Sequence, residues 1–149
     1  MDESLGLDTQ IVLQLNHADS VSEVIDIAYK NLSQNPSGEA IIKRLQNIID
    51  IAKGDGIDLS VNSLKGMILF LSTAPYIRKP AITVDDDGIF YTSWRKTLKE
   101  KVIVSFENEQ ILNYVIFQPS QYTDNRVVLD GTANILDFHN TTVIKWEEW

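Results

Sequence analysis

The densest cluster of reactive side chains is residues 85–88, Asp-Asp-Asp-Gly. Carboxylate oxygens are the ligands that hard cations such as Ca²⁺ and Mg²⁺ prefer. An EF-hand alignment, however, puts Thr83 at the first ligand position and Trp94 where a bidentate glutamate is needed, which excludes that kind of loop. A looser Mg²⁺ or Ca²⁺ site is the alternative, but Asp-Gly between two strand-like runs is typical of a hairpin turn. We favour the turn and predict no metal or cofactor.

Conventional catalytic groups are scarce in this chain. It has no cysteine, which excludes a disulfide framework, a thiolate zinc site and a cysteine nucleophile. The only histidines, His17 and His139, belong to no recognisable motif, and His17 is interpreted as a surface residue. No phosphate-binding loop, dinucleotide fingerprint, nucleophile elbow or zinc-protease motif occurs. We therefore predict a protein that is not an enzyme. A pocket between helices and sheet that contains one of the histidines is the alternative.

One basic cluster follows the hairpin, and Tyr91 and Trp94 are interleaved with it. Basic and aromatic side chains together are typical of nucleic-acid binding through phosphate contacts and stacking. A formal net charge of −8 and a pI near 4.6 oppose that interpretation. We favour a solvated connection between strands, whose charges discourage edge pairing. The cluster consists of Arg95, Lys96, Lys99 and Lys101.

The last four residues carry two large aromatic side chains, Trp146 and Trp149. Such residues either fold back over the core or anchor another chain, as aromatic residues do at binding hot spots. Folding back is favoured because an exposed apolar end is a liability. Both interpretations stay open at this point.

The first half of the chain has helical periodicity. Ser20 and Glu23 have the spacing of a capping box, which predicts a helix that continues to Leu32. Apolar residues at three- and four-residue steps predict a second helix from about Ala40, ended by Gly54, with Ala40 on its buried side and Arg44 on its solvated side.

A further helix begins after Ser60 or Asn62 and runs to about Thr73. It is apolar around most of its girth, so it should be the most buried helix, and Gly66 should allow close packing. Before these helices, residues 11–15 form an apolar run that we interpret as helix, and residues 1–8 are expected to be a loose end.

The second half has runs of β-branched and aromatic residues, which are typical of β-strands. Runs at 80–84, 89–94, 101–106 and 111–117 are joined by short turns, and such tight connections require antiparallel neighbours. Residues 126–129 are predicted as a short strand, followed by a short helix capped by Thr132. Residues 142–146 are predicted as a last strand.

Length and composition fit one globular domain over residues 1–149, helical over about 9–74 and a β-meander over about 80–149. The predicted fold class is α+β, with three to four N-terminal helices packed on one face of a four- to six-stranded antiparallel sheet. The acidic N-terminus and the absence of an apolar run of about 20 residues predict a cytoplasmic protein without membrane contact.

The pattern around the hairpin resembles a group of small uncharacterised bacterial proteins. In that group a helical part is followed by P-x-(I/V), a D-G turn, a strand ending in Trp, and a meander that often carries a second D-G turn. The resemblance covers about residues 64–117, and residues 107–109 (Glu-Asn-Glu) stand where the second D-G is expected. It implies a setting in mobile or defence-related loci and assigns no catalytic residue. The matching residues are Pro80, Ile82, Val84, Asp87, Gly88 and Trp94.

These observations predict a protein-binding module, either an antitoxin-like or immunity-like protein or an inhibitor of a bacterial defence or toxin protein. Its partner is expected to be a protein, and a homodimer is compatible. Small-ligand binding and nucleic-acid binding through residues 95–101 are the alternatives. The binding surface is expected on the sheet face away from the helices, on the irregular segment 119–125, on the basic cluster and at the C-terminus. The candidate partner-binding residues are Tyr91, Trp94, Arg95, Lys96, Lys99, Tyr114, Tyr122, Trp146 and Trp149.

Overall fold

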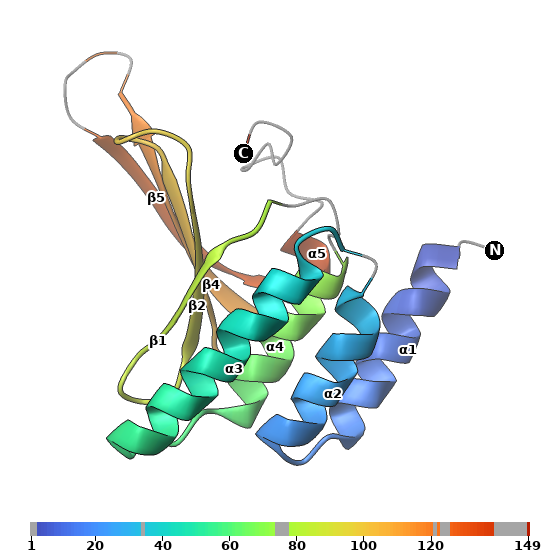
Figure 1. Cartoon of the computed structure of the whole chain (residues 1–149). Helices are drawn as coiled ribbons and strands as arrows, with labels where there is room; N and C mark the ends of the chain where they lie inside the picture. Colours follow the sequence, from blue (N-terminus) through green and yellow to red (C-terminus); the bar gives the residue numbers. More distant parts are fainter. Residues whose placement is uncertain (1–2, 34, 74–77, 121, 123–125, 139–148) are drawn as a thin grey trace.

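The computed structural model describes residues 3–33, 35–73, 78–120, 122, 126–138 and 149. Among the described residues, four helices come first along the chain, five strands follow, and one short helix comes after the strands (Figure 1). In order these elements are α1 (Glu3–His17), α2 (Val21–Leu32), α3 (Gly38–Asp55), α4 (Val61–Thr73), β1 (Ala81–Val84), β2 (Phe90–Arg95), β3 (Lys101–Phe106), β4 (Ile111–Pro119), β5 (Arg126–Asn134) and α5 (Ile135–Phe138).

The predicted capping box begins α2. The Ser20 Oγ accepts a hydrogen bond from the Glu23 amide at 3.2 Å, and the Glu23 carboxylate accepts one from the Asp19 amide at 2.9 Å. The loose end predicted for residues 1–8 is wrong for residues 3–8, which belong to α1. The second half of α1 anchors this helix, because its residues Ile11 and Leu15 are buried in the core.

The third helix extends beyond its predicted end. Gly54 is helical, and the left-handed residue that ends α3 is Gly56, with φ of 69°. Ala40, predicted to be buried, is exposed. Arg44, predicted to be solvated, donates to the Ile82 carbonyl oxygen from Nε and Nη2 at 3.2 and 3.0 Å, which ties α3 to β1.

The fourth helix is the most buried, as predicted, with residues 63–71 all buried. Ser60 provides its cap, because the Ser60 Oγ accepts from the Ser63 amide at 3.1 Å. A β-carbon on Gly66 would meet the Asn108 carbonyl oxygen, so this glycine lets α4 approach the turn between β3 and β4. The close packing predicted for Gly66 is confirmed.

The sheet is a five-stranded antiparallel meander in the order β1-β2-β3-β4-β5. The turn between β1 and β2 has Gly88 at φ of 79°, and the Gly88 amide donates to the Asp85 carbonyl oxygen at 3.0 Å. This is hairpin geometry, as predicted. Strand β5 is longer than expected, so Thr132 lies in the strand; Asn134 instead caps α5, its Oδ1 accepting from the Leu136 amide at 3.0 Å.

All four N-terminal helices lie on one side of the sheet (Figure 1). Helix α4 packs on β2 and β3, α3 on β1 and α5 on β5, while α1 and α2 pack against α4. The predicted α+β class, with helices on one face of an antiparallel sheet, is confirmed. None of the described helices has the length and apolar character needed to cross a membrane. The predicted strand at 142–146 lies outside the described residues.

Candidate partner-binding surface

One face of the sheet points away from the helices, and we call it the outer face. Side chains alternate between faces along a strand, so the buried positions of each strand identify the helix-facing set and the intervening positions identify the outer face. Strand register places the outer-face side chains in rows across neighbouring strands. On β2 to β5 these side chains include Tyr91, Ser93, Arg95, Lys101, Ile103, Ser105, Ile111, Asn113, Val115, Phe117, Pro119, Val128, Asp130, Thr132 and Asn134.

Four of them form a continuous apolar group, Ile103, Val115, Phe117 and Val128, which we call the outer strip. Ile103 pairs with Val115 across β3 and β4, and Phe117 pairs with Val128 across β4 and β5. Val128 is 53% exposed and the other three are partly exposed. An antiparallel sheet face that only contacts water is normally polar, so this strip departs from what solvation alone requires.

Basic residues border the strip on the β2 side. Lys101 lies directly opposite Phe117, and Arg95 lies directly opposite Lys101, so one row reads Arg95, Lys101, Phe117, Val128. Residues that are paired directly across neighbouring strands project to the same face of the sheet, so these four side chains lie side by side on the outer face. The outer face therefore combines an apolar centre with a positively charged edge.

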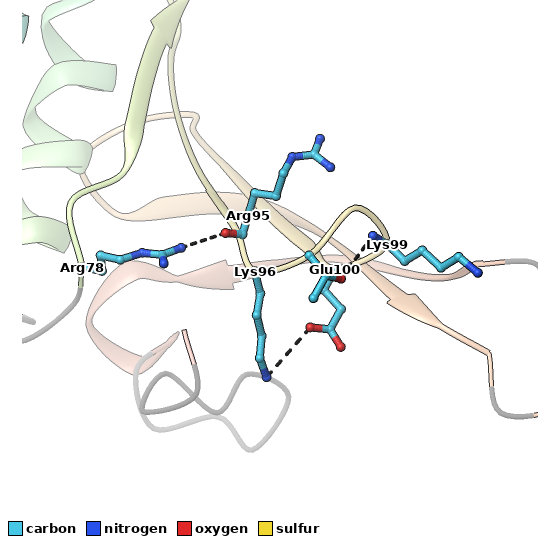
Figure 2. Close-up of polar contacts among 6 residues, drawn as sticks. Arg78, Arg95, Lys96, Lys99 and Glu100 are labelled. Carbon is cyan, nitrogen blue, oxygen red and sulfur yellow. Dashed lines mark hydrogen bonds and ion pairs between the residues drawn. The ribbon is translucent and has the colours of Figure 1, made fainter.

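The turn after β2 continues this positive edge. Arg78 donates to the Arg95 carbonyl oxygen at 2.8 Å, and Arg95 donates to the Leu98 carbonyl oxygen at 3.2 Å. Lys96 lies 3.9 Å from the Glu100 carboxylate. Figure 2 shows the side chains of Arg95 and Lys99 extending in different directions, so the cluster does not converge on one phosphate-sized point. Leu98 is 85% exposed at the tip of this turn.

The two ends of the sheet carry opposite charge. The end that contains the β2–β3 turn is rich in Lys and Arg residues, whereas the end that contains the β1–β2 and β3–β4 turns is acidic. Antiparallel topology produces this separation, because alternate turns lie at the same end of a meander. The basic end has Arg78, Lys79, Arg95, Lys96, Lys99 and Lys101, with Glu100 among them. The acidic end has Asp85, Asp86, Asp87, Glu107 and Glu109.

Tyr91 lies on the outer face as predicted. Its hydroxyl donates to the Asp85 carboxylate at 3.1 Å. Burial raises the pKa of Tyr91 above its ordinary value of 10.0, and the hydrogen bond to Asp85 and the negative charges of Asp85 and Asp87 raise it further. The Asp85 Oδ1 accepts from the amides of Asp87 and Ile89, both at 3.0 Å. The Asp85 carboxylate therefore organises the turn and orients the tyrosine.

Trp94 is not on the outer face, so its prediction as a partner-binding residue is wrong. It is 2% exposed, faces the helices and packs against Phe70 with ring centroids 6.0 Å apart. Its Nε1 donates to the Arg78 carbonyl oxygen at 2.6 Å. Tyr91 and Trp94 are three positions apart in one strand, and residues an odd number apart face opposite sides.

Tyr114 also faces the helices, so its predicted place on the other face is wrong. Its ring centroid lies 5.2 Å from that of Phe138, and the ring covers Gly131 on the adjacent strand. Tyr122 is 91% exposed, which keeps it available to a partner. Trp149 packs against the core with the Lys96 Nζ 5.9 Å from its ring centroid, which agrees with the folded-back interpretation. Trp146 lies outside the described residues.

Sequence reasoning missed the outer strip. The runs at 102–104 and 114–117 are apolar at consecutive positions, so period-two alternation does not reveal which residues face outward. A signal was nonetheless present. Along a strand with one solvated face, apolar and polar residues should alternate, and in these two runs they do not.

Two cavities bear on the alternative prediction, a small-ligand pocket that contains one of the histidines. An open groove of about 700 Å³ lies between α2 and α3, and a smaller cavity of about 250 Å³ lies between α1, α4 and the end of the sheet. Neither is lined by His17, which is exposed at the end of α1. His139 lies outside the described residues. Within the described part of the chain, no three Asp, Glu or His side chains gather closely enough to hold a metal ion.

Comparison with known proteins gives no match to a protein-family model, a curated protein or a solved structure. The resemblance to small bacterial proteins from mobile or defence-related loci stays a prediction.

Proposed function

We propose that this chain is a non-enzymatic protein-binding module whose outer face receives a protein partner. The single observation that carries the proposal is the outer strip, four adjacent apolar residues on the sheet face that no described helix covers. Interfaces place apolar and aromatic residues at the centre and polar residues around them. Ile103, Val115, Phe117 and Val128 supply such a centre.

The charge next to the strip specifies the chemistry of the partner. Arg95 and Lys101 continue the row of Phe117 and Val128, and the basic end of the sheet lies beside them. Complementary charge steers encounter and rejects partners of like charge. The partner is therefore a protein surface with an apolar centre and carboxylates at its edge. An antitoxin-like, immunity-like or inhibitory role against a bacterial defence or toxin protein agrees with this mode of binding and with the resemblance in residues 64–117.

A matched pair of substitutions tests the proposal. Ile103→Asp puts a charge in the outer strip, and Ile51→Asp makes the same change on α3, where Ile51 is 57% exposed and remote from the outer face. We expect wild-type protein and Ile51→Asp to capture one stoichiometric protein partner from the native cytoplasm and Ile103→Asp to lose it. Both variants should keep the wild-type circular dichroism spectrum.

Four results would count against the proposal. If Ile103→Asp still captures the partner, the interface does not lie on the outer face. If the wild-type protein captures no partner, the proposed protein-binding function is wrong. Recovery of nucleic acid, with affinity that falls steeply with salt, favours the basic cluster as a nucleic-acid site instead. Self-association that Ile103→Asp disrupts identifies a second copy of this chain as the occupant, in place of an acidic partner.

A further inference from the structure

The two edges of the sheet differ in how they are protected. Strand β1 has four residues, α3 packs on it, and the Arg44 guanidinium donates to the Ile82 carbonyl oxygen. Short strands and covering groups prevent a sheet edge from pairing with another chain. At the opposite edge, β5 has nine residues and pairs with β4 alone among the described strands. In the described part of the chain, the β5 edge therefore lacks the short length and the guanidinium cap that protect β1.

The hydrogen-bond pattern shows which backbone groups of β5 face this edge. The Ile135 amide donates to the Gln110 carbonyl oxygen at 2.8 Å, and these two residues continue the β4–β5 register. Orientation alternates along an antiparallel strand, so the odd-numbered residues of β5 bond to β4 and the even-numbered residues direct their N–H and C=O groups outward. Among the described residues, no backbone group pairs with the outward groups of Val128, Asp130 and Thr132. The edge therefore presents donors and acceptors to a further strand.

Apolar side chains at this edge are exposed on both faces of the sheet. Val128 is 53% exposed on the outer face. Leu129 pairs with the buried Ile116, so it lies on the helix-facing side, yet it is 42% exposed. The start of β5 extends beyond the helix layer (Figure 1), which leaves Leu129 accessible. A long edge strand with exposed apolar residues favours addition of another strand.

The order of residues along β5 is complementary to itself. When two copies of the strand pair antiparallel with Val128 opposite Val128, residue 126 of each copy lies opposite residue 130 of the other. The sequence has arginine at 126 and aspartate at 130, so both ends of the pairing join opposite charges. All three positions are even-numbered, so outward donors meet outward acceptors. A pairing centred on Asp130 would instead oppose two carboxylates, which is unfavourable.

We propose that this chain forms a symmetric dimer through the β5 edge, with Val128 at the two-fold axis. Each copy supplies the same strand, and the two sheets become one continuous antiparallel sheet. The outer strip reaches the edge of the sheet at Val128, so it continues across the axis into the outer strip of the second copy. This contact uses the strand edge and not the outer face, so it does not depend on the proposed function.

Sedimentation velocity of the whole chain over a range of concentrations tests the dimer. We expect the wild type to convert from monomer to dimer as its concentration rises to about 1 mM. Val128→Pro removes an N–H group that points away from β4, and edge strands tolerate proline at such positions. This variant should keep the wild-type circular dichroism spectrum. Its dimerisation should be weaker by about tenfold to a hundredfold, because two hydrogen bonds across the axis are lost.

A charge swap tests the register. Asp130→Arg puts arginine opposite Arg126 at both ends of the pairing and should weaken dimerisation by about tenfold. Adding Arg126→Asp to this variant restores opposite charges in exchanged positions, so the affinity should return to within about threefold of the wild type. Ile103→Asp on the outer face and Ile51→Asp on α3 lie away from the β5 edge and should leave dimerisation unchanged.

The inference is overturned if the wild type stays monomeric up to about 1 mM, or if Val128→Pro folds as the wild type does and dimerises with unchanged affinity. The charge swap decides the question if Val128→Pro does not fold, because a double variant that dimerises no better than Asp130→Arg contradicts the proposed register. A dimer that Ile103→Asp abolishes and Val128→Pro preserves would place the second copy on the outer face, against the inference. Loss of partner capture by Ile103→Asp with an intact dimer concerns the proposed function alone, so the two are tested separately.

Discussion

The two faces of this sheet are built from neighbouring residues of the same strands and differ in burial. On β3, Val104 is fully buried against the helices, whereas Ile103 beside it is partly exposed on the outer face. Both are β-branched and apolar, so composition does not distinguish them. The helices cover the face that carries Val104, and no described helix covers the face that carries Ile103. The comparison indicates that the outer strip exceeds what a solvated face needs, which is why we assign it to a partner.

The largest expected effect comes from placing the same charge on each face. Val104→Asp puts a carboxylate in the core, where burial of an unpaired charge destabilises by several kcal/mol, so we expect no cooperative unfolding transition at room temperature. Ile103→Asp should remain folded and lose at most about 1 kcal/mol, because its carboxylate stays in contact with water. Urea unfolding followed by circular dichroism measures both.

A cooperative transition with near wild-type stability for Val104→Asp would show that the helix layer does not exclude water from the sheet. Unfolding of Ile103→Asp would show that the outer face is part of a core in the free protein, and the comparison of the two faces would then fail.

An intermediate effect is expected where α4 meets the sheet. A β-carbon at Gly66 would press on the Asn108 backbone, so Gly66→Ala should destabilise by about 1–3 kcal/mol through a shift of the β3–β4 turn. Gly54→Ala is the matched control on α3, since nothing lies near its added methyl group, and it should stabilise by about 0.5–1 kcal/mol. Equal effects of the two substitutions would indicate that α4 is not in close contact with the turn.

The fold class could be predicted from the sequence, but the side chains that lie on the outer face could not. The capping box at Ser20, the apolar girth of α4 and the Asp-Gly turn at Gly88 are local signals, and each predicted its element correctly. The outward direction of Ile103 and the burial of Trp94 depend instead on which face the helices cover. That choice is tertiary, and in strands that are apolar on both faces a shift of one residue exchanges the two sets.

The smaller cavity was equally invisible in the sequence. Its described wall comes from residues 12, 16, 69, 109–110 and 134–136, which only the folded chain brings together. The end of α3 gives a smaller instance of the same limit, because Gly54 and Gly56 are both suitable caps and only the backbone geometry selects Gly56.

The smallest expected effect concerns Tyr91, which joins the outer face to the acidic turn. Its pKa in the folded protein is raised, so the phenol form that donates to Asp85 is the one that folding favours. This stabilisation is fully present below the unfolded pKa of 10.0 and is lost as the pH rises through the folded pKa. At neutral pH, Tyr91→Phe should destabilise by about 0.5–1.5 kcal/mol, the net contribution of one hydrogen bond.

The difference in unfolding free energy between wild type and Tyr91→Phe should therefore shrink as the pH rises from the unfolded pKa of 10.0 through the higher folded pKa. Tyr122→Phe is the control, since Tyr122 is 91% exposed and its removal should leave the pH profile unchanged. A difference that stays constant across this range would mean that the Asp85 carboxylate does not hold the Tyr91 proton. The contact that joins the outer face to the acidic end of the sheet would then contribute nothing to stability.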